Sequence, residues 1–124
     1  MSEHSHQCAL FSWARNPATL KKYPALDLLE GSTNGVKMGF KLGKKMKDAG
    51  MLKGSHDITL KVARGGFNGL SIELKRPESV CVKKGVLSAE QKWYGSRLEQ
   101  EGWRVEYCFG WDAARDVIVD YLSK

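Results

Sequence analysis

The fold is decided by residues 54–75, which read GSHDITLKVARGGFNGLSIELK. At both ends of this stretch, aliphatic or β-branched residues alternate with polar ones, a pattern typical of short strands. The glycine-rich run at residues 65–69 supplies the turn chemistry between them. We therefore predict a β-hairpin whose first strand lies within residues 54–60 and is opened by Asp57, and whose second strand covers residues 69–75.

The second strand of this hairpin has two chemically different faces. Because side chains alternate across a strand, Ser71, Glu73 and Lys75 share one face, and the aliphatic residues between them form the other. Asp57 comes beside Glu73 if the hairpin is in register. Two ionised carboxylates about 4 Å apart repel by roughly 4 kcal/mol at an effective dielectric of about 20. A positive charge is therefore needed between them.

Two interpretations of this polar face stay open on spacing alone. A hard divalent cation held by the two carboxylates would offset their repulsion and leave Lys75 free for a bound water or a phosphate. The alternative is an ordinary solvated strand face, with a surface Asp57 and a Glu73-Lys75 pair.

An Asp that opens one strand, followed by Glu-x-Lys in the next, resembles the signature of the PD-(D/E)xK nuclease superfamily. The surroundings are similar, in order and spacing, to the virus-type replication-repair nuclease (VRR-NUC) domain of stand-alone, phage type. The similar residues span nearly the whole chain: Glu3, Gln7, Trp13-Ala14-Arg15, Tyr23-Pro24, Asn34-Gly35, Lys53-Gly54, and residues 69–75, 85–91 and 102–105.

The interleaved strands and helices predict a single α/β domain over residues 1–124, with helices flanking a small mixed sheet. The resemblance implies the same core, restriction-endonuclease-like, and an Mg²⁺- or Mn²⁺-dependent deoxyribonuclease. The predicted metal ligands are Asp57, Glu73, Glu3 and the Leu74 carbonyl, and the predicted catalytic residues are Asp57, Glu73, Lys75, Gln91 and Glu3.

The resemblance also implies a substrate and a setting. Stand-alone members of this size look like phage enzymes that form symmetric dimers and cut branched DNA such as four-way (Holliday) junctions, and larger relatives belong to DNA repair. We therefore expect a homodimer that cuts branched DNA in the cytoplasm of a bacterial host, with no membrane or small-molecule partner. Two rival hypotheses are a non-catalytic DNA-binding protein with a nuclease fold and a sequence-specific restriction enzyme.

His56 departs from the family pattern, which usually has Pro immediately before the metal-binding Asp. Pro fixes its own backbone angle, whereas His56 can adopt the same conformation without enforcing it. The interpretations are a second metal ligand, a proton shuttle, or an ordinary loop histidine near the site.

Other candidate site residues also have a structural explanation. Glu3, four residues before Gln7 on one helix face, suits a solvated first turn, and the resemblance places both near the metal. Gln91 is the third helical residue after Ser88, a capping box, and the resemblance places it beside the catalytic Lys. Glu30 is a further candidate carboxylate.

The net charge of +6 and the pI near 9.3 favour a polyanionic partner. Between residues 37 and 53, six lysines face one acid, Asp48, and a second basic cluster flanks the proposed site. Either these lysines contact the DNA backbone, with binding that weakens as salt rises, or they form a solvated helix face. The predicted DNA-binding residues are Lys37, Lys41, Lys44, Lys45, Lys53, Lys83 and Lys84.

The remaining pattern predicts helices over residues 3–15, 36–49, 89–101 and 113–122, a strand over 103–109, and a short helix at 25–30. The apolar stripe of the 36–49 helix is expected to face the core. Three widely spaced cysteines, without a C-x-x-C pair, predict free thiols in a reducing compartment: Cys8, Cys81 and Cys108.

Overall fold

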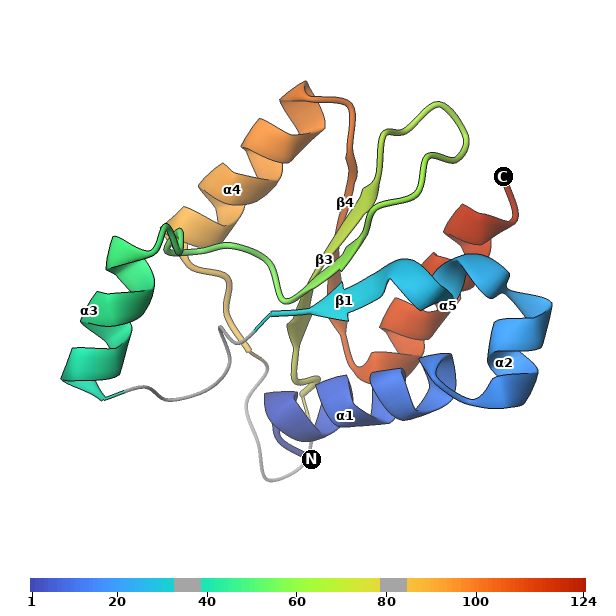
Figure 1. The fold of residues 1–124 in the computed structure, drawn as a ribbon, viewed down its shortest axis with the longest axis horizontal. Helices are drawn as coiled ribbons and strands as arrows, with labels where there is room; N and C mark the ends of the chain where they lie inside the picture. Colours follow the sequence, from blue (N-terminus) through green and yellow to red (C-terminus); the bar gives the residue numbers. More distant parts are fainter. Residues whose placement is uncertain (33–38, 79–84) are drawn as a thin grey trace.

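The computed structural model describes residues 1–32, 39–78 and 85–124, which form a four-stranded mixed sheet flanked by helices (Figure 1). The sheet order is β1-β2-β3-β4, antiparallel except for the parallel pair of β3 and β4. This confirms the predicted α/β class. In chain order the elements are α1 (Glu3–Ala14), α2 (Pro17–Lys22), the 3-10 helix η1 (Pro24–Leu28), β1 (Leu29–Gly31), α3 (Phe40–Asp48), β2 (Ile58–Leu60), β3 (Leu70–Lys75), α4 (Ala89–Gln100), β4 (Arg104–Phe109) and α5 (Trp111–Leu122).

The predicted hairpin is formed by β2 and β3. Ile58 pairs with Ile72 in an antiparallel register, so the residue before Ile58 comes opposite the residue after Ile72. These two residues are Asp57 and Glu73. The register therefore sets the two carboxylates side by side, as the alternation of the sequence predicts.

One face of the sheet packs against α1 and α5, which contact each other and β3. Burial of aliphatic side chains on this face supplies the main stabilising contribution to the domain. The fully buried residues include Leu10 and Ala14 of α1, Ile118 and Tyr121 of α5, and Leu70, Ile72 and Leu74 of β3. The aliphatic face of β3 thus packs into the hydrophobic core, as the sequence pattern predicts.

The other face of β3 and β4 is covered by α4, which comes close because Gly95 has no side chain. A Cβ at Gly95 would collide with the Tyr107 hydroxyl of β4 and lie 3.1 Å from Val105 Cγ1. The sheet is therefore covered on both faces at β3, and all six residues of this strand are buried.

The segment between α1 and α3 differs from the prediction. A short helix over residues 25–30 was expected, but the 3-10 helix η1 ends at Leu28, and Leu29–Gly31 forms β1 against β2. Leu29 is 1% exposed and pairs with Leu60. The edge of β2 was open to pairing, and a tertiary contact of this kind overrides a weak local helix pattern.

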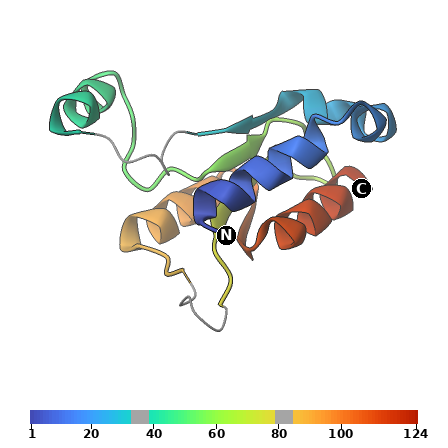
Figure 2. The same cartoon turned by 90° about the horizontal axis from the view of Figure 1, so that it is seen from below.

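α3 was expected to turn its apolar stripe toward the core, and in its described part this prediction is wrong. None of the residues of α3 is buried, and Phe40 and Leu42 are 87% and 50% exposed. In Figure 2, α3 lies apart from α1, α2 and α5. At β3 and β4 both faces of the sheet are already occupied, since α1 and α5 pack on one face and α4 on the other.

Within the described ranges, no helix is long and apolar enough to cross a membrane. Cys8 is exposed and Cys108 is buried, both as free thiols, whereas Cys81 lies outside the described residues. Burial raises the pKa of the Cys108 thiol to about 12, so this cysteine stays protonated near neutral pH.

Candidate functional site

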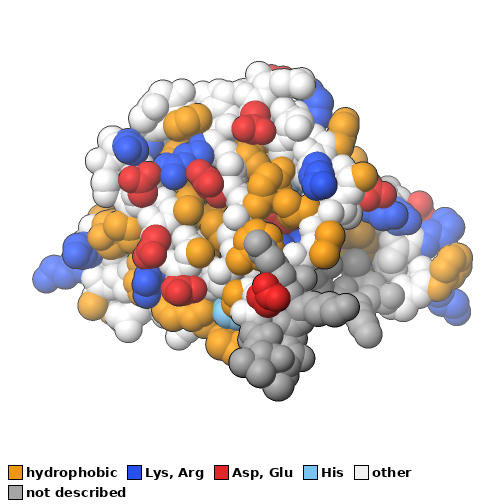
Figure 3. Space-filling view, turned by 180° about the vertical axis from the view of Figure 1, so that it is seen from behind, with side chains coloured by type: hydrophobic (Ala, Val, Ile, Leu, Met, Phe, Trp, Pro, Cys, Tyr) orange, Lys and Arg blue, Asp and Glu red, His pale blue; other side chains and the backbone are white. Residues whose placement is uncertain are grey.

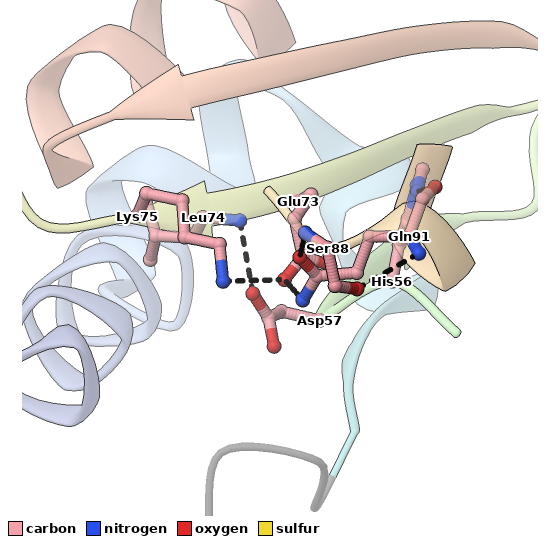
Figure 4. Close-up of polar contacts among 7 residues, drawn as sticks. All are labelled: His56, Asp57, Glu73, Leu74, Lys75, Ser88 and Gln91. Carbon is pink, nitrogen blue, oxygen red and sulfur yellow. Dashed lines mark hydrogen bonds and ion pairs between the residues drawn. The ribbon is translucent and has the colours of Figure 1, made fainter. Parts of the chain in front are cut away.

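Four polar side chains meet where β2 begins and β3 ends (Figure 4). Asp57, Glu73 and Lys75 come from the hairpin, and Gln91 comes from the first turn of α4. Glu73 is 2% exposed, and Asp57 and Lys75 are each 8% exposed. Charged residues are almost never buried to this degree unless they are paired, so a solvated strand face does not describe this site.

Asp57 is fixed through both its side chain and its backbone. Its Oδ2 accepts a hydrogen bond from the Leu74 N–H (2.9 Å), and its carbonyl accepts one from the Ser32 N–H (2.6 Å). Gln7 of α1 donates from Nε2 to the Ser32 carbonyl (3.5 Å). Helix α1 is therefore linked to Asp57 through Ser32, which brings the predicted Gln7 near the site without direct contact to the carboxylates.

Glu73 has one satisfied and one unsatisfied carboxylate oxygen. Its Oε1 accepts a hydrogen bond from Gln91 Nε2 (2.8 Å) and lies 3.7 Å from Lys75 Nζ. Its Oε2 is buried and has no hydrogen-bond partner among the described residues. Burial, together with the neighbouring Asp57 carboxylate, raises the pKa of Glu73 to about 9 despite the attraction of Lys75.

Gln91 takes part in the helix cap and also contacts a site carboxylate. Its backbone N–H donates to Ser88 Oγ (3.1 Å) and its Oε1 accepts from the Ser88 N–H (2.9 Å), which completes the predicted capping box. Its remaining amide group donates to Glu73. The start of α4 thereby fixes the orientation of one site carboxylate.

The backbone of Leu74 points toward the same place. The Gly110 N–H donates to the Lys75 carbonyl (2.9 Å), so the backbone groups of Lys75 face β4. Neighbouring residues in a strand point their backbone groups in opposite directions. The N–H and carbonyl of Leu74 therefore face the side of β3 on which Asp57 lies, and the carbonyl is available to the site.

Glu3, at the start of α1, lies next to Lys75 across Gly85. A Cβ placed on Gly85 would be 3.1 Å from Glu3 Oε1 and 3.1 Å from Lys75 Cβ. Within the described residues, however, no three His, Cys, Asp or Glu side chains form a metal-binding cluster. Glu3 thus lies near the site without joining Asp57 and Glu73 in such a cluster, and its role as a metal ligand stays a prediction.

The residues present fit a hard divalent cation. Two adjacent carboxylates and one backbone carbonyl are the oxygen donors that Mg²⁺ and Mn²⁺ prefer. Burial and the Asp57 carboxylate disfavour the ionised form of Glu73, and a cation bound in place of the proton would offset both and would give the buried Glu73 Oε2 a partner. Water molecules would complete the coordination of an ion held by so few protein ligands.

His56 is a buried structural bridge and not a metal ligand. It is 2% exposed; its Nε2 lies 3.0 Å from the Gln91 carbonyl and its Nδ1 lies 2.8 Å from Ser71 Oγ. A carbonyl only accepts, so Nε2 carries the proton that it donates. Burial lowers the pKa of His56, which favours the neutral ring, and Ser71 then donates to Nδ1. With both nitrogens engaged, the imidazole joins β3 to α4.

Replacing His56 with Phe is expected to lower the free energy of unfolding by about 1–3 kcal/mol. The ring contacts with Tyr94 and Tyr107 can be kept, but the Gln91 carbonyl and the Ser71 hydroxyl lose their partner. Urea denaturation measures the change. His4→Phe is the matched control because His4 is exposed on α1. An equal, small effect of the two substitutions would contradict the bridging role.

Two buried polar residues carried no clear signal in the sequence. Ser71 is fully buried below α4, and its only hint was a place on the same strand face as Glu73. His6 of α1 accepts a hydrogen bond at Nδ1 from the Trp111 N–H (3.1 Å) and so caps α5. Glu30 is exposed, with Oε1 3.8 Å from Lys61 Nζ, and does not join the site.

The predicted DNA-binding lysines are only partly described. Lys41, Lys44 and Lys45 are exposed on α3; Lys44 also pairs with Asp48 (3.0 Å), and Lys53 pairs with Glu90 (3.4 Å). Figure 3 shows acidic and basic side chains interleaved on the face opposite that of Figure 1, with further basic side chains at the edge where α3 projects. Three of the predicted lysines lie outside the described residues: Lys37, Lys83 and Lys84.

No family model matches the chain, and no curated protein matches it. A solved structure described as "VRR_NUC domain protein" aligns with a TM-score of 0.79 over 99% of this chain and 89% of that chain, at 24% sequence identity. The chain has the fold of a VRR-NUC domain. The predicted resemblance is confirmed for the fold, and in this VRR-NUC fold the buried carboxylate pair lies where β2 begins and β3 ends.

Proposed function

We propose that the protein is an Mg²⁺- or Mn²⁺-dependent deoxyribonuclease. In this proposal Asp57, Glu73 and Lys75 form the active site that hydrolyses the phosphodiester bonds of DNA. The observation that carries this proposal is Glu73 Oε2, a buried carboxylate oxygen with no partner among the described residues, next to Asp57. A purely structural strand would gain nothing from two adjacent buried carboxyl groups, because burying ionisable groups destabilises the fold. A phosphodiesterase needs them to hold a cation.

The residues of the site have separate functions in this hydrolysis. Asp57, Glu73 and the Leu74 carbonyl would hold the ion, and Gln91 keeps the Glu73 carboxylate oriented. The bound ion would polarise the scissile phosphate and lower the pKa of a coordinated water. As the water oxygen bonds to phosphorus, one P–O ester bond breaks and the leaving oxygen takes up a proton. Lys75 orients or deprotonates the water, or stabilises the charge that develops on the phosphate.

We place the substrate among branched DNA molecules, with four-way junctions first. This choice rests on the resemblance to stand-alone, phage-type members of the family. The same resemblance supports a homodimer acting in a phage-infected or prophage-bearing bacterial cell, since two symmetric active sites suit a two-fold junction. Light scattering at micromolar concentration, with and without DNA, measures the oligomeric state, and a monomer in both would contradict the dimer.

We expect Mn²⁺-dependent cleavage that is fastest on four-way junctions and slowest on uninterrupted duplex. A panel of single strands, duplexes, flaps and junctions, each with Mn²⁺, Mg²⁺ or a chelator, measures this order. Cleavage in the chelator would contradict the dependence on metal. Equal cleavage of duplex and junction would contradict the substrate and would favour a restriction-type enzyme.

Calorimetric titration with Mn²⁺ separates the enzyme from a non-catalytic DNA-binding protein of the same fold. A nuclease should bind the ion and release a proton from Glu73, because the raised pKa leaves this carboxyl protonated near neutral pH. A DNA-binding protein without turnover should bind DNA in a salt-dependent manner and give no ion-binding signal.

A further inference from the structure

A pocket of about 310 Å³ lies beside the site, between the end of α3 and the first turn of α4. Its walls include Lys47 of α3, the segment with Met51, Leu52 and Lys53, and Ser88 and Gln91 at the start of α4. Gln91 contributes to both the pocket and the carboxylate site, since it lines the pocket and its Nε2 donates to Glu73 Oε1. A group bound in this pocket would therefore be an immediate neighbour of a phosphate bound at the carboxylates.

The wall formed by residues 51–55 is held directly against α4. Gly54 has a φ of +87°, and a Cβ on it would be 2.5 Å from the Glu90 carbonyl carbon, so only glycine allows this approach. Lys53 Nζ lies 3.4 Å from Glu90 Oε1, and the Met51 N–H donates to the Met46 carbonyl (3.0 Å). The pocket is thus built by defined contacts on both sides.

The lining combines two kinds of chemistry. The ammonium of Lys47 attracts an anion, as does that of Lys53, which also pairs with Glu90. The side chains of Met51 and Leu52 offer apolar surface. Leu52 is 55% exposed, although a leucine normally gains from burial. A nucleotide has the matching parts, an anionic phosphate and a flat base with apolar faces. The volume is at the small end of the range for small-ligand sites, enough for one nucleotide but not for a base pair in a duplex.

We propose that this pocket binds one unpaired nucleotide of the substrate strand, next to the scissile phosphate. Its phosphate lies against Lys47 and Lys53, and its base, turned out of the stack, covers Met51 and Leu52. This inference rests on the proposed nuclease function and adds a reason for its substrate preference. A base at a junction, a flap or a single strand leaves the stack at lower cost than a base inside a duplex, so the pocket selects against uninterrupted duplex.

The test uses a fluorescent adenine analogue, 2-aminopurine, placed at each nucleotide flanking the cleavage position of a flap substrate. Binding is measured with Ca²⁺ in place of Mn²⁺. We expect fluorescence to rise at one position for the wild-type protein, because the base leaves its neighbours and meets non-aromatic side chains. Leu52→Ala and the double variant Met51→Ala/Leu52→Ala should lose this rise and bind the flap about tenfold more weakly, with duplex binding changed by less than about twofold.

Leu28→Ala is the matched control, because Leu28 in η1 is also 55% exposed and does not line the pocket. This control should behave as the wild type. Lys47→Gln should weaken binding to every substrate and reduce the dependence on salt, as expected for a phosphate contact.

Three results would overturn the inference. The first is that the double variant shows the same fluorescence rise as the wild type and the same ratio of flap affinity to duplex affinity. The second is the absence of any rise at all flanking positions in the wild type. The third is a loss of self-association in Leu52→Ala, which would make the pocket a contact between copies. Failure of the proposed function is distinguishable, since it appears as no Mn²⁺-dependent cleavage by the wild type whatever the fluorescence shows.

Discussion

Asp57→Asn is expected to reduce DNA cleavage in Mg²⁺ or Mn²⁺ by about 10³-fold or more while the fold stays intact. The amide oxygen of Asn can still accept the hydrogen bond that Asp57 Oδ2 accepts from the Leu74 N–H, so the local backbone keeps its partner. The substitution removes the negative charge that the cation needs. Single-turnover cleavage of a four-way junction measures the loss, and calorimetric titration with Mn²⁺ should show no binding.

Asp116→Asn provides the control for Asp57→Asn, because Asp116 is a surface carboxylate of α5 whose side chain is 72% exposed. Its replacement should leave cleavage unchanged. A junction-cleavage rate for Asp57→Asn within a few-fold of the control would remove Asp57 from the catalytic centre and, with it, the proposed function.

Glu73→Gln is expected to stabilise the metal-free protein at pH 8 and to abolish its stabilisation by Mn²⁺. The raised pKa of about 9, against an ordinary value of 4.5, means that between these pH values the folded state holds a proton that the unfolded state has released. The wild-type free energy of unfolding therefore falls as pH rises through this window, by up to about 1.4 kcal/mol per pH unit. The neutral amide introduced by Glu73→Gln does not titrate, so it has no such slope, and its oxygen still accepts from Gln91.

Urea denaturation between pH 5 and pH 9, with and without Mn²⁺, measures both effects of Glu73→Gln. At pH 8 the metal-free variant should exceed the wild type by roughly 3–5 kcal/mol, because only the wild type must take up a proton on folding at this pH. Mn²⁺ should stabilise the wild type only. Glu99→Gln, an exposed change on α4, should retain both the pH dependence and the response to Mn²⁺. Equal pH slopes for Glu73→Gln and Glu99→Gln would contradict the raised pKa.

The hairpin could be predicted from local sequence because strand alternation and turn chemistry act over a few residues. The same rule gave the register that puts Asp57 beside Glu73, and the spacing of Ser88 and Gln91 gave the capping box. The direction of α3 could not be predicted. A period of 3.6 residues defines an apolar stripe, but where that stripe points depends on which surfaces other helices already cover.

The features of the candidate site can be divided in the same way, into those predicted from local sequence and those set by tertiary contacts. The sequence by itself determined which residues of the hairpin share a face, and hence that a carboxylate pair and a lysine lie together. Only the tertiary structure decided that this face is buried, that His56 bridges β3 and α4, and that Glu3 lies beside Lys75. The physical reason is separation along the chain. Backbone periodicity is set within a strand, whereas the burial of the site and the pKa of Glu73 depend on α4 and α1, which approach from distant parts of the chain.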